Sequence, residues 1–234
     1  MEVKIGLVSG ESWETGCEEN ERLCDALSNR GIHGEMVVWD RGIDELSDYD
    51  ALMIRSCWDY HERPEEFHRW LGQLDGVPTT VLNSPDVLRW NMDKVYLKEL
   101  DEAGFPVIPS VFFERGEQPE LKEVMARNGW DDIVVKPRIG ASGHEMFRVD
   151  RTNHHGIEDE IQSVVRSKGV FIQPYLESIR ERGEWSFVFF GGEYQYAIHK
   201  QPGPDDFRAH NHRGATYRHA DPEPAPEPGP DPSA

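Results

Sequence analysis

Runs of apolar residues separated by polar turns predict that the chain begins with a parallel α/β unit. Mostly apolar runs at 3–8 and 50–54 predict buried strands, and another short strand is expected at 35–39. Apolar residues at helical spacing predict a helix over 18–30. Strand, helix and strand in this order indicate parallel pairing. Ligands bind such sheets beyond the carboxyl ends of the strands, so we expect functional residues after 3–8 and after 50–54.

The pattern continues into a second unit in which antiparallel turns become frequent. One helix is expected to start at Pro64, and another to cover 94–103. The other predicted elements are strands at 107–113, 132–136, 145–149 and 170–172 and helices at 119–128 and 157–166. Two further strands, 185–190 and 194–199, meet at two adjacent glycines and predict a hairpin. The predicted fold class is α/β, with α+β character in the second half.

Residues 221–234 differ in composition from the rest of the chain. After Asp221 the sequence reads PEPAPEPGPDPSA, in which proline alternates with acidic and small residues. Such a segment cannot bury a core, and we expect a disordered, solvated tail.

The charge balance adds an expectation about the setting of the protein. The chain has 44 acidic and 25 basic residues and a formal net charge of −19, and only 7 of the basic residues are lysines. Self-repulsion of this size destabilises a compact chain in dilute buffer, whereas molar salt shortens the screening length to about 3 Å. We therefore expect a halophilic source. The same negative field disfavours nucleic acid as a partner, because nucleic acid needs a basic surface.

Membrane and extracellular settings are also disfavoured by the sequence. No apolar run approaches the roughly 20 residues of a membrane span, and the start MEVKIGLVSG is typical of a first strand rather than of a signal peptide. Cys17, Cys24 and Cys57 offer neither a disulfide framework nor the spacing of a metal site. We expect a cytoplasmic protein with no membrane partner, and the oligomeric state is open.

The first candidate for chemistry follows the predicted strand 132–136. That strand ends at Lys136, and a loop of small residues, GASG at 140–143, comes shortly after it. Lys94 and Lys200 also lie beside predicted turns or strand ends. Compact cations and backbone N–H groups suit a triphosphate, although the loop matches neither the GxGxxG nor the P-loop spacing. A lysine at a strand end can also simply extend to water, and the residues alone leave that alternative open.

A second candidate is the exit of the strand 170–172, at Gln173, Pro174 and Tyr175. An exposed backbone edge there would bind an adenine while flanking apolar groups sandwich the ring, and a plain strand exit is the alternative. The segment RSCWDY at 55–60 follows another predicted strand, at the edge where a substrate is expected.

These motifs resemble those of the ATP-grasp fold. In the second half the resemblance is carried by VVKP with its small-residue loop, FIQPYLESIRERGEWSFVFF, the strand AIHK and DFRAHNHRG. In the first half, VVWD, YDALMIRSCWDYHERPEEFHRWL and NSPDVLRWNMDKVYLKEL resemble the branch that includes O-ureido-serine cyclo-ligase and glutathione-synthetase-like ligases. The resemblance runs from residue 3 to about residue 215. It implies a Rossmann-like pre-ATP-grasp domain over 1–90 and an ATP-grasp domain of two α+β lobes over 91–220, followed by the tail 221–234.

The resemblance also implies a role for each matching residue. The implied ATP-binding residues are Lys94, Lys136, Gly140, Ala141, Ser142, Gly143, Gln173, Pro174, Tyr175 and Glu184. The implied catalytic cations are Lys200 and Arg208, and the implied substrate-side residues are Arg55, Trp58 and Asp59. Both ATP-site lysines contact phosphates, the loop 140–143 forms a lid over them, 173–175 lines the adenine and Glu184 lies near the ribose. Either Arg55 or Arg208 clamps a substrate carboxylate.

The reaction implied by the resemblance joins a carboxylate to an amine. The carboxylate of a small amino-acid-like molecule attacks the γ-phosphoryl group of Mg-ATP, and an amine then displaces phosphate from the resulting acyl phosphate. The two groups belong to separate molecules in a ligase and to one molecule in a cyclo-ligase. ATP and Mg²⁺ are the expected cofactors, and catalysis rests on positioning and charge stabilisation.

The sequence departs from the family pattern near its end. Family members carry magnesium-binding carboxylates on two strands after the DFR motif, whereas the acids after Arg218 alternate with proline. The metal ligands are therefore unknown, and the alternative expectation is a catalytically inactive or partner-completed ATP-binding protein. Cys57 stands where we expect threonine, and packing is the favoured interpretation of it. Ordinary polar contacts rather than metal binding are expected for His199, His210, His212 and His219.

Overall fold

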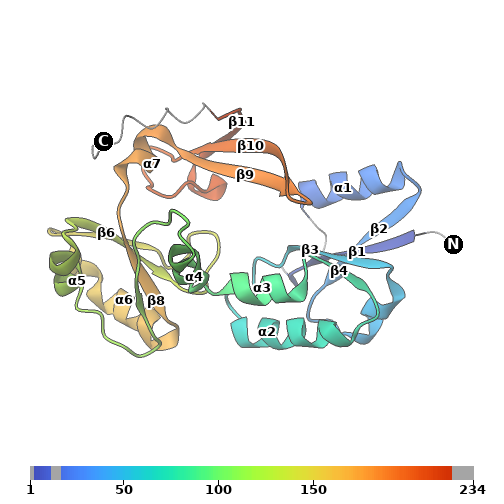
Figure 1. Cartoon of the computed structure of the whole chain (residues 1–234), viewed down its shortest axis with the longest axis horizontal. Coiled ribbons are helices and arrows are strands. Elements are labelled where there is room, and N and C mark those ends of the chain that lie inside the picture. Colours follow the sequence, from blue (N-terminus) through green and yellow to red (C-terminus); the bar gives the residue numbers. More distant parts are fainter. Residues whose placement is uncertain (1–2, 12–16, 223–234) are drawn as a thin grey trace. The chain divides into compact units, whose positions relative to one another are not determined.

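The computed structural model describes residues 3–11 and 17–222 of the chain (Figure 1). The chain divides into two compact units between Pro174 and Tyr175. From residue 223 on, the predicted tail lies outside the described residues. The boundary predicted between residues 90 and 91 stays a prediction.

The first unit opens with the parallel sheet that the sequence predicts, in the order β2-β1-β3-β4. Its strands are β1 (Val3–Ser9), β2 (Ile32–Val38), β3 (Ala51–Ser56) and β4 (Thr80–Leu82), and all the pairings are parallel. Helix α1 (Glu18–Ser28) connects β1 to β2, and α2 (Pro64–Gln73) follows β3. Short 3₁₀ helices cover Asp44–Asp48 and Leu74–Gly76. The sequence analysis missed β4, because three residues are too few to show a period.

A core of apolar side chains packs against this sheet. Leu52, Phe67 and Leu71 are among its buried members, and Trp39 packs edge-on against Phe67 with 5.2 Å between the ring centroids. Gly6 on β1 permits this packing, because an added Cβ atom would lie 2.8 Å from Leu52 Cδ2. The core thus fixes β1 and β3 side by side, with their carboxyl ends at the same edge of the sheet.

Two short helices continue the chain after this sheet. Helix α3 (Pro85–Met92) begins after Ser84, whose Oγ accepts the backbone N–H of Val87 at 3.4 Å. Helix α4 (Tyr96–Glu102) starts two residues later than predicted, because Asp93 Oδ1 accepts the N–H of Val95 at 3.0 Å and holds a turn there. Lys94 therefore lies in the turn between α3 and α4 and does not open a helix.

The second sheet of the first unit is antiparallel, in the order β5-β8-β6-β7. Its strands are β5 (Val111–Phe113), β6 (Asp132–Pro137), β7 (Phe147–Asp150) and β8 (Val170–Pro174), and its helices are α5 (Leu121–Asn128) and α6 (His154–Ser167). One face of the sheet is fully apolar: Ile133, Val135, Val149, Val170 and Ile172 form a core with residues of α5 and α6. The alternation of side chains along each strand places Lys136, Phe171 and Gln173 on the other face, which is therefore partly polar and partly apolar.

Two strand starts in this region differ from the sequence prediction. The strand expected at 107–113 is shortened to β5, because Pro109 lacks an N–H group for the ladder. The strand expected at 145–149 begins at Phe147, because Glu145 has a left-handed backbone with φ of 53°. The exposed backbone edge expected at the exit 173–175 does not extend back to Ile172, since β8 lies between β5 and β6 there.

The second unit contains the predicted hairpin. Its sheet has the order β11-β10-β9, with β9 (Glu184–Phe190), β10 (Glu193–Gln201) and β11 (Thr216–His219), and α7 (Glu177–Arg182) precedes β9. Gly191 and Gly192 form the turn with φ of 60° and 85°, a conformation that favours glycine. A 3₁₀ turn covers Asn211–Arg213. The sequence analysis missed α7 and β11.

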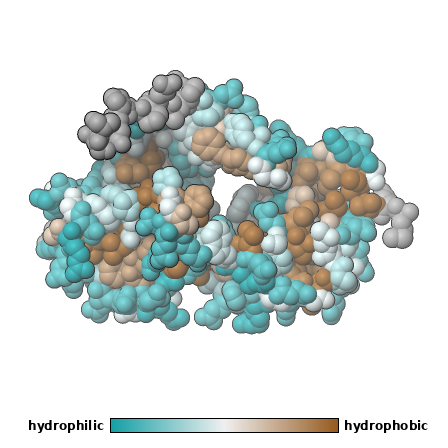
Figure 2. All heavy atoms as spheres, viewed as in Figure 1, coloured by the Kyte–Doolittle hydropathy of each residue, from teal (hydrophilic) through white to brown (hydrophobic). Residues whose placement is uncertain are grey.

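Most of the surface seen in Figure 2 is hydrophilic, in keeping with the excess of acidic residues. Apolar side chains are exposed along the β9–β10 hairpin, where Phe187, Phe189, Phe190 and Tyr194 are between 44% and 65% exposed. In the part of the chain that the structure describes, no helix is both long enough and apolar enough to span a membrane.

Candidate functional site

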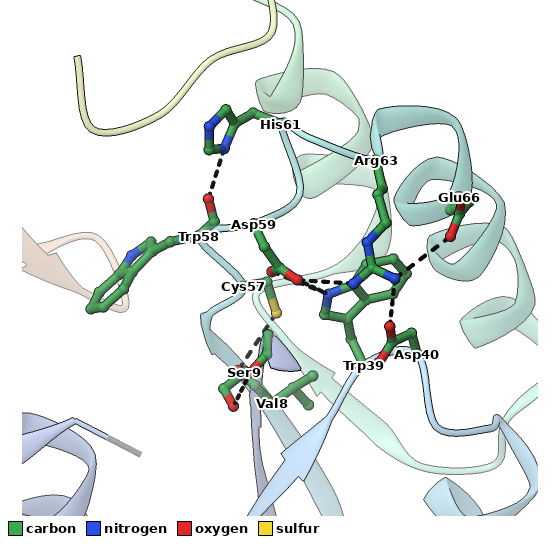
Figure 3. Close-up of polar contacts among 11 residues, drawn as sticks. Val8, Ser9, Trp39, Asp40, Cys57, Trp58, Asp59, His61, Arg63 and Glu66 are labelled. Carbon is green, nitrogen blue, oxygen red and sulfur yellow. Dashed lines mark hydrogen bonds and ion pairs between the residues drawn. The ribbon is translucent and has the colours of Figure 1, made fainter. Parts of the chain in front are cut away.

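The turn after β3 is held by a compact polar cluster (Figure 3). Both carboxylate oxygens of Asp59 accept the indole N–H of Trp39 at 3.2 Å, and Oδ2 also accepts Arg63 Nη2 at 3.0 Å. Arg63 lies over the Trp39 ring at 4.6 Å and is ion-paired with Asp40. The Asp59 carboxylate is thus engaged within the turn. Trp58 is 40% exposed, and its indole points away from this cluster (Figure 3).

Cys57 lies beneath the same turn. It is buried, and its thiol donates to the carbonyl of Val8 at 3.6 Å. Burial raises the pKa of the Cys57 thiol, with smaller contributions from Asp59 and Asp40. A thiol with a raised pKa is a poor nucleophile, so the geometry agrees with the packing interpretation.

Arg55, at the end of β3, is held along one edge of its guanidinium group. Its Nε donates to Asn20 Oδ1 at 2.9 Å, and Asn20 Nδ2 donates to Ser56 Oγ at 2.7 Å. Asn20 is completely buried, whereas Arg55 is exposed. Among residues 3–11 and 17–222, the two terminal nitrogens of Arg55 have no hydrogen-bond partner. Arg55 is therefore oriented by a buried amide and presents two parallel donors, which is the geometry that binds a carboxylate.

Asn20 is not among the residues predicted from the sequence, although its place on a helix could have indicated it. Asn20 shares the apolar stripe of α1 with Leu23, Cys24 and Leu27, at spacings of three, four and seven residues. An amide on the apolar stripe of a helix has to find buried partners.

The loop at 140–143 is tethered to the first sheet. Tyr60, in the turn after β3, donates its hydroxyl hydrogen to the carbonyl of Gly140 at 3.0 Å. Ser142 and Gly143 have left-handed backbones, with φ of 55° and 65°, and Ala141 accepts the N–H of His144 at 3.0 Å. The predicted substrate side and the predicted phosphate loop are thus joined by a hydrogen bond within the first unit.

Lys94 lies in the turn before α4, and its backbone N–H donates to the carbonyl of Arg138 at 2.9 Å. Arg138 in turn bonds Asp93 through Nε and Nη2, at 3.1 and 2.8 Å. Burial lowers the pKa of Lys94, and Asp93 partly offsets this effect. Apart from the Tyr96 ring at 5.9 Å, the Lys94 ammonium contacts no hydrogen-bonding or charged partner among the described residues. A partly buried ammonium of this kind suits an anionic ligand.

Lys136, near the end of β6, lies on the face of the second sheet opposite the apolar core of α5 and α6. Its Nζ donates to Gln173 Oε1 at 2.6 Å and lies 5.7 Å from the centroid of the Phe171 ring. Gln173 is only 4% exposed. Past Ile172, pairing with β5 ends while pairing with β6 continues to Pro174. At Gln173 and Pro174, β8 is therefore paired with β6 on one side and no longer with β5 on the other. The predicted adenine contact of Gln173, Pro174 and Tyr175 stays a prediction.

The other predicted residues belong to the second unit. Lys200 on β10 is paired in register with Glu184 on β9, and their charged groups are 3.3 Å apart. Arg208 bonds Asp206 through Nε at 2.8 Å and Nη2 at 2.7 Å. Hydrogen bonding to Arg208 lowers the pKa of Asp206 to about 2. Tyr175 packs edge-on against Phe207 at 6.3 Å. The roles predicted for these residues stay predictions.

Within the described residues, no cluster of three or more histidine, cysteine or acidic side chains has the geometry of a metal site. Among the histidines near the end of the chain, His210 has a lowered pKa, and burial is the main cause. The described residues therefore identify no magnesium ligands.

Comparisons with known proteins give the chain a family. Residues 5–83 match the family model described as D-cycloserine synthetase DcsG, N-terminal domain, and residues 98–222 match the model described as prokaryotic glutathione synthetase, ATP-grasp domain. The cycloserine biosynthesis protein DcsG of Streptomyces lavendulae is 31% identical over 182 residues, which cover 76% of this chain and 60% of the relative. A glutathione synthetase of Nitrosomonas europaea is 26% identical over 73% of this chain and 52% of the relative.

Solved structures agree with these matches. The crystal structure of D-cycloserine synthetase DcsG has a TM-score of 0.79 and 28% identity, and the match covers 93% of this chain and 75% of that chain. D-alanine–D-alanine ligase from Bacillus anthracis complexed with ATP has a TM-score of 0.62 at 16% identity, a likeness of fold alone. The chain spans about half to three fifths of the length of these two curated relatives. Because the glutathione-synthetase model matches more than half of its residues, the chain belongs to the ATP-grasp family.

Proposed function

We propose that the protein is an ATP-dependent ligase that joins a carboxylate to an amine on small amino-acid-like molecules. Two independent lines support this proposal. The first is similarity to known proteins, namely the ATP-grasp match over residues 98–222 and the relatives DcsG and glutathione synthetase. The second is the environment of the Lys94 ammonium group. In a chain with 44 acids and 25 bases, Lys94 is partly buried and no acidic group pairs with it in the described part. This single observation carries the proposal, because such an ammonium favours a polyanion such as the phosphates of ATP.

In the proposed reaction a substrate carboxylate takes the γ-phosphoryl group of ATP, and an amine displaces phosphate to leave an amide. Lys94 and Lys136 hold the phosphates, and the backbone of the loop 140–143 covers them. Their contribution is positioning and charge stabilisation rather than proton transfer. If magnesium is bound, it adds further neutralisation of the phosphate oxygens.

For the substrate carboxylate we propose Arg55 rather than Arg208. Arg208 already directs two of its nitrogens to Asp206, so a carboxylate ligand would have to displace that pair. Arg55 has only one nitrogen engaged among the described residues, and that bond orients the other two. Asp59 is proposed to hold the turn and not to contact the substrate, because its oxygens serve Trp39 and Arg63.

The proposal is tested by titration calorimetry with ATP in molar KCl. Lys94→Met should weaken ATP binding at least tenfold, whereas Lys122→Met, an exposed lysine on α5, should leave it unchanged. Equal affinities for the two variants would refute the phosphate assignment. ADP release is then measured with panels of amino acids, and Arg55→Lys should raise the KM for the carboxylate substrate with a smaller change in kcat. ATP binding without ADP release across the panel would instead favour a non-catalytic ATP-binding protein.

A further inference from the structure

Gln173 on β8 makes hydrogen bonds at both ends of its amide. Its Oε1 accepts Lys136 Nζ at 2.6 Å, and its Nε2 donates to Ser110 Oγ at 2.8 Å. The Ser110 hydroxyl donates in turn to the carbonyl of Ile108 at 2.8 Å. These four groups form a continuous chain from a backbone carbonyl to a lysine ammonium. Each member thereby fixes the orientation of the next.

The register of the sheet explains why these groups meet. Val111 pairs with Ile172 across β5 and β8, so Ser110 stands one position earlier, opposite Gln173. Lys136 pairs with Phe171 across β6 and β8, and side chains two residues apart share a face of a strand. Gln173 and Phe171 therefore flank the Lys136 ammonium from one strand, the amide bonding it and the ring lying 5.7 Å from it.

Burial makes this arrangement specific. Gln173 is 4% exposed and Phe171 5% exposed, and Phe112 stacks on Phe171 with 5.6 Å between the ring centroids. A buried amide keeps its orientation because turning it would leave polar atoms without partners. A lysine side chain has several rotatable bonds, and the fixed amide limits the positions that its ammonium can take.

We propose that Gln173, held by Ser110, is a positioning residue that sets the Lys136 ammonium for the phosphates of ATP, and is not a residue that lines the adenine. This inference rests on the proposed ATP site. A neutral amide suits this task, because it accepts a hydrogen bond from the ammonium without bringing in a negative charge. A carboxylate at the same position would compete with the phosphates for that ammonium.

The test compares ATP with adenosine, which has no phosphates, by titration calorimetry on the full chain. Gln173→Met keeps the length of the side chain and removes both hydrogen bonds. It should weaken ATP binding about tenfold, which corresponds to about 1.4 kcal/mol, and should change adenosine binding by less than about twofold. Gln173→Glu should weaken ATP binding further with the same selectivity. Gln73→Met, at an exposed position on α2, is the matched control.

A double-mutant cycle separates positioning from a general structural effect. In a Lys136→Met background, Gln173→Met should cause no further loss of ATP affinity, because the group that it positions is gone. Should Gln173→Met fail to fold, Ser110→Ala, which removes only one hydroxyl group, should give a smaller, phosphate-selective loss of about threefold.

The outcomes distinguish the two proposals. If wild-type protein binds ATP and Gln173→Met weakens ATP and adenosine equally, Gln173 lines the adenine and this inference is overturned while the proposed function stands. If the two losses add in the double mutant, Gln173 does not act through Lys136, and the inference is again overturned. If wild-type protein does not bind ATP at all, the proposed function fails and this inference fails with it.

Discussion

Replacing Arg138 by glutamine should destabilise the first unit and weaken ATP binding together. Arg138 is 15% exposed; it forms a two-bond pair with Asp93 and lies 2.6 Å from a carboxylate oxygen of Glu114. Its backbone joins Lys94 to Gly169: the Arg138 carbonyl accepts the N–H of Lys94, and the Arg138 N–H donates to the carbonyl of Gly169, both at 2.9 Å. Both the backbone and the side chain of Arg138 therefore hold the turn that carries Lys94 against the second sheet, and the substitution removes the side-chain part.

The magnitude follows from the exposure of the two pairs. Glu114 is 69% exposed, so that pair contributes only about 0–1 kcal/mol. Asp93 is 31% exposed and accepts two hydrogen bonds from Arg138, which places its pair between the surface and buried limits, at about 1–2 kcal/mol. A total of about 2 kcal/mol corresponds to a fall in Tm of about 4–8 °C in a chain of this size.

The assay is thermal unfolding followed by circular dichroism, with ATP affinity measured below the transition. Arg115→Gln is the control, because Arg115 is exposed and contacts the carbonyl of Arg166 at 3.3 Å, and it should change stability by less than about 0.5 kcal/mol. If Arg138→Gln has the same Tm and the same ATP affinity as Arg115→Gln, the pair with Asp93 does not hold the Lys94 turn, and the prediction is refuted.

Three other measurements check separate parts of the structure. Asp206→Asn should lower the free energy of unfolding by about 1–2 kcal/mol near pH 7. Hydrogen bonding to Arg208 lowers the folded-state pKa of Asp206 to about 2. The stabilisation by Asp206 is therefore fully present above the unfolded pKa near 4 and is lost as pH falls towards 2. Urea unfolding should therefore show the two proteins converging about pH 2, and a constant difference at all pH values would contradict this. Tyr60→Phe removes the hydroxyl that bonds Gly140 and should speed hydrogen exchange in the loop 140–143; unchanged exchange would mean that the bond does not hold the loop. Raising KCl from about 0.1 M to about 2 M should raise the Tm, because the net charge of −19 is then screened, and a falling Tm would count against the halophilic expectation.

Local pattern was enough to predict most of the fold. Mostly apolar runs predicted β1 and β3, and the glycine pair predicted the hairpin of the second unit, because each of these signals lies within a few neighbouring residues. The missed strand β4 has only three residues, and the strand expected at 107–113 was shortened by the loss of a backbone donor at Pro109. Elements with a strong local signal were therefore predictable, while their ends depended on single residues.

The candidate site was less predictable, because its contacts join distant positions. Ser110 and Gln173 are 63 residues apart, and Asn20 and Arg55 are 35 residues apart. No spacing rule links them, and their meeting depends on strand register and on helix packing. The positions of Lys94 and Lys136 beside a turn and a strand end did single them out as candidate phosphate-binding cations, and that role stays a prediction. The sequence did not indicate Asn20, the buried amide that bonds Arg55, and it predicted Gln173 as an adenine contact rather than as a hydrogen-bond partner of Lys136.

The aromatic side chains exposed on the β9–β10 hairpin have a consequence for handling the protein. At low ionic strength the negative charge on every molecule keeps such surfaces apart. Concentrated salt is expected to stabilise the folded chain, but it also weakens this repulsion between molecules and favours contacts between exposed rings. Colloidal stability and conformational stability should therefore respond to salt in opposite directions, and an intermediate salt concentration should suit crystallisation or storage best.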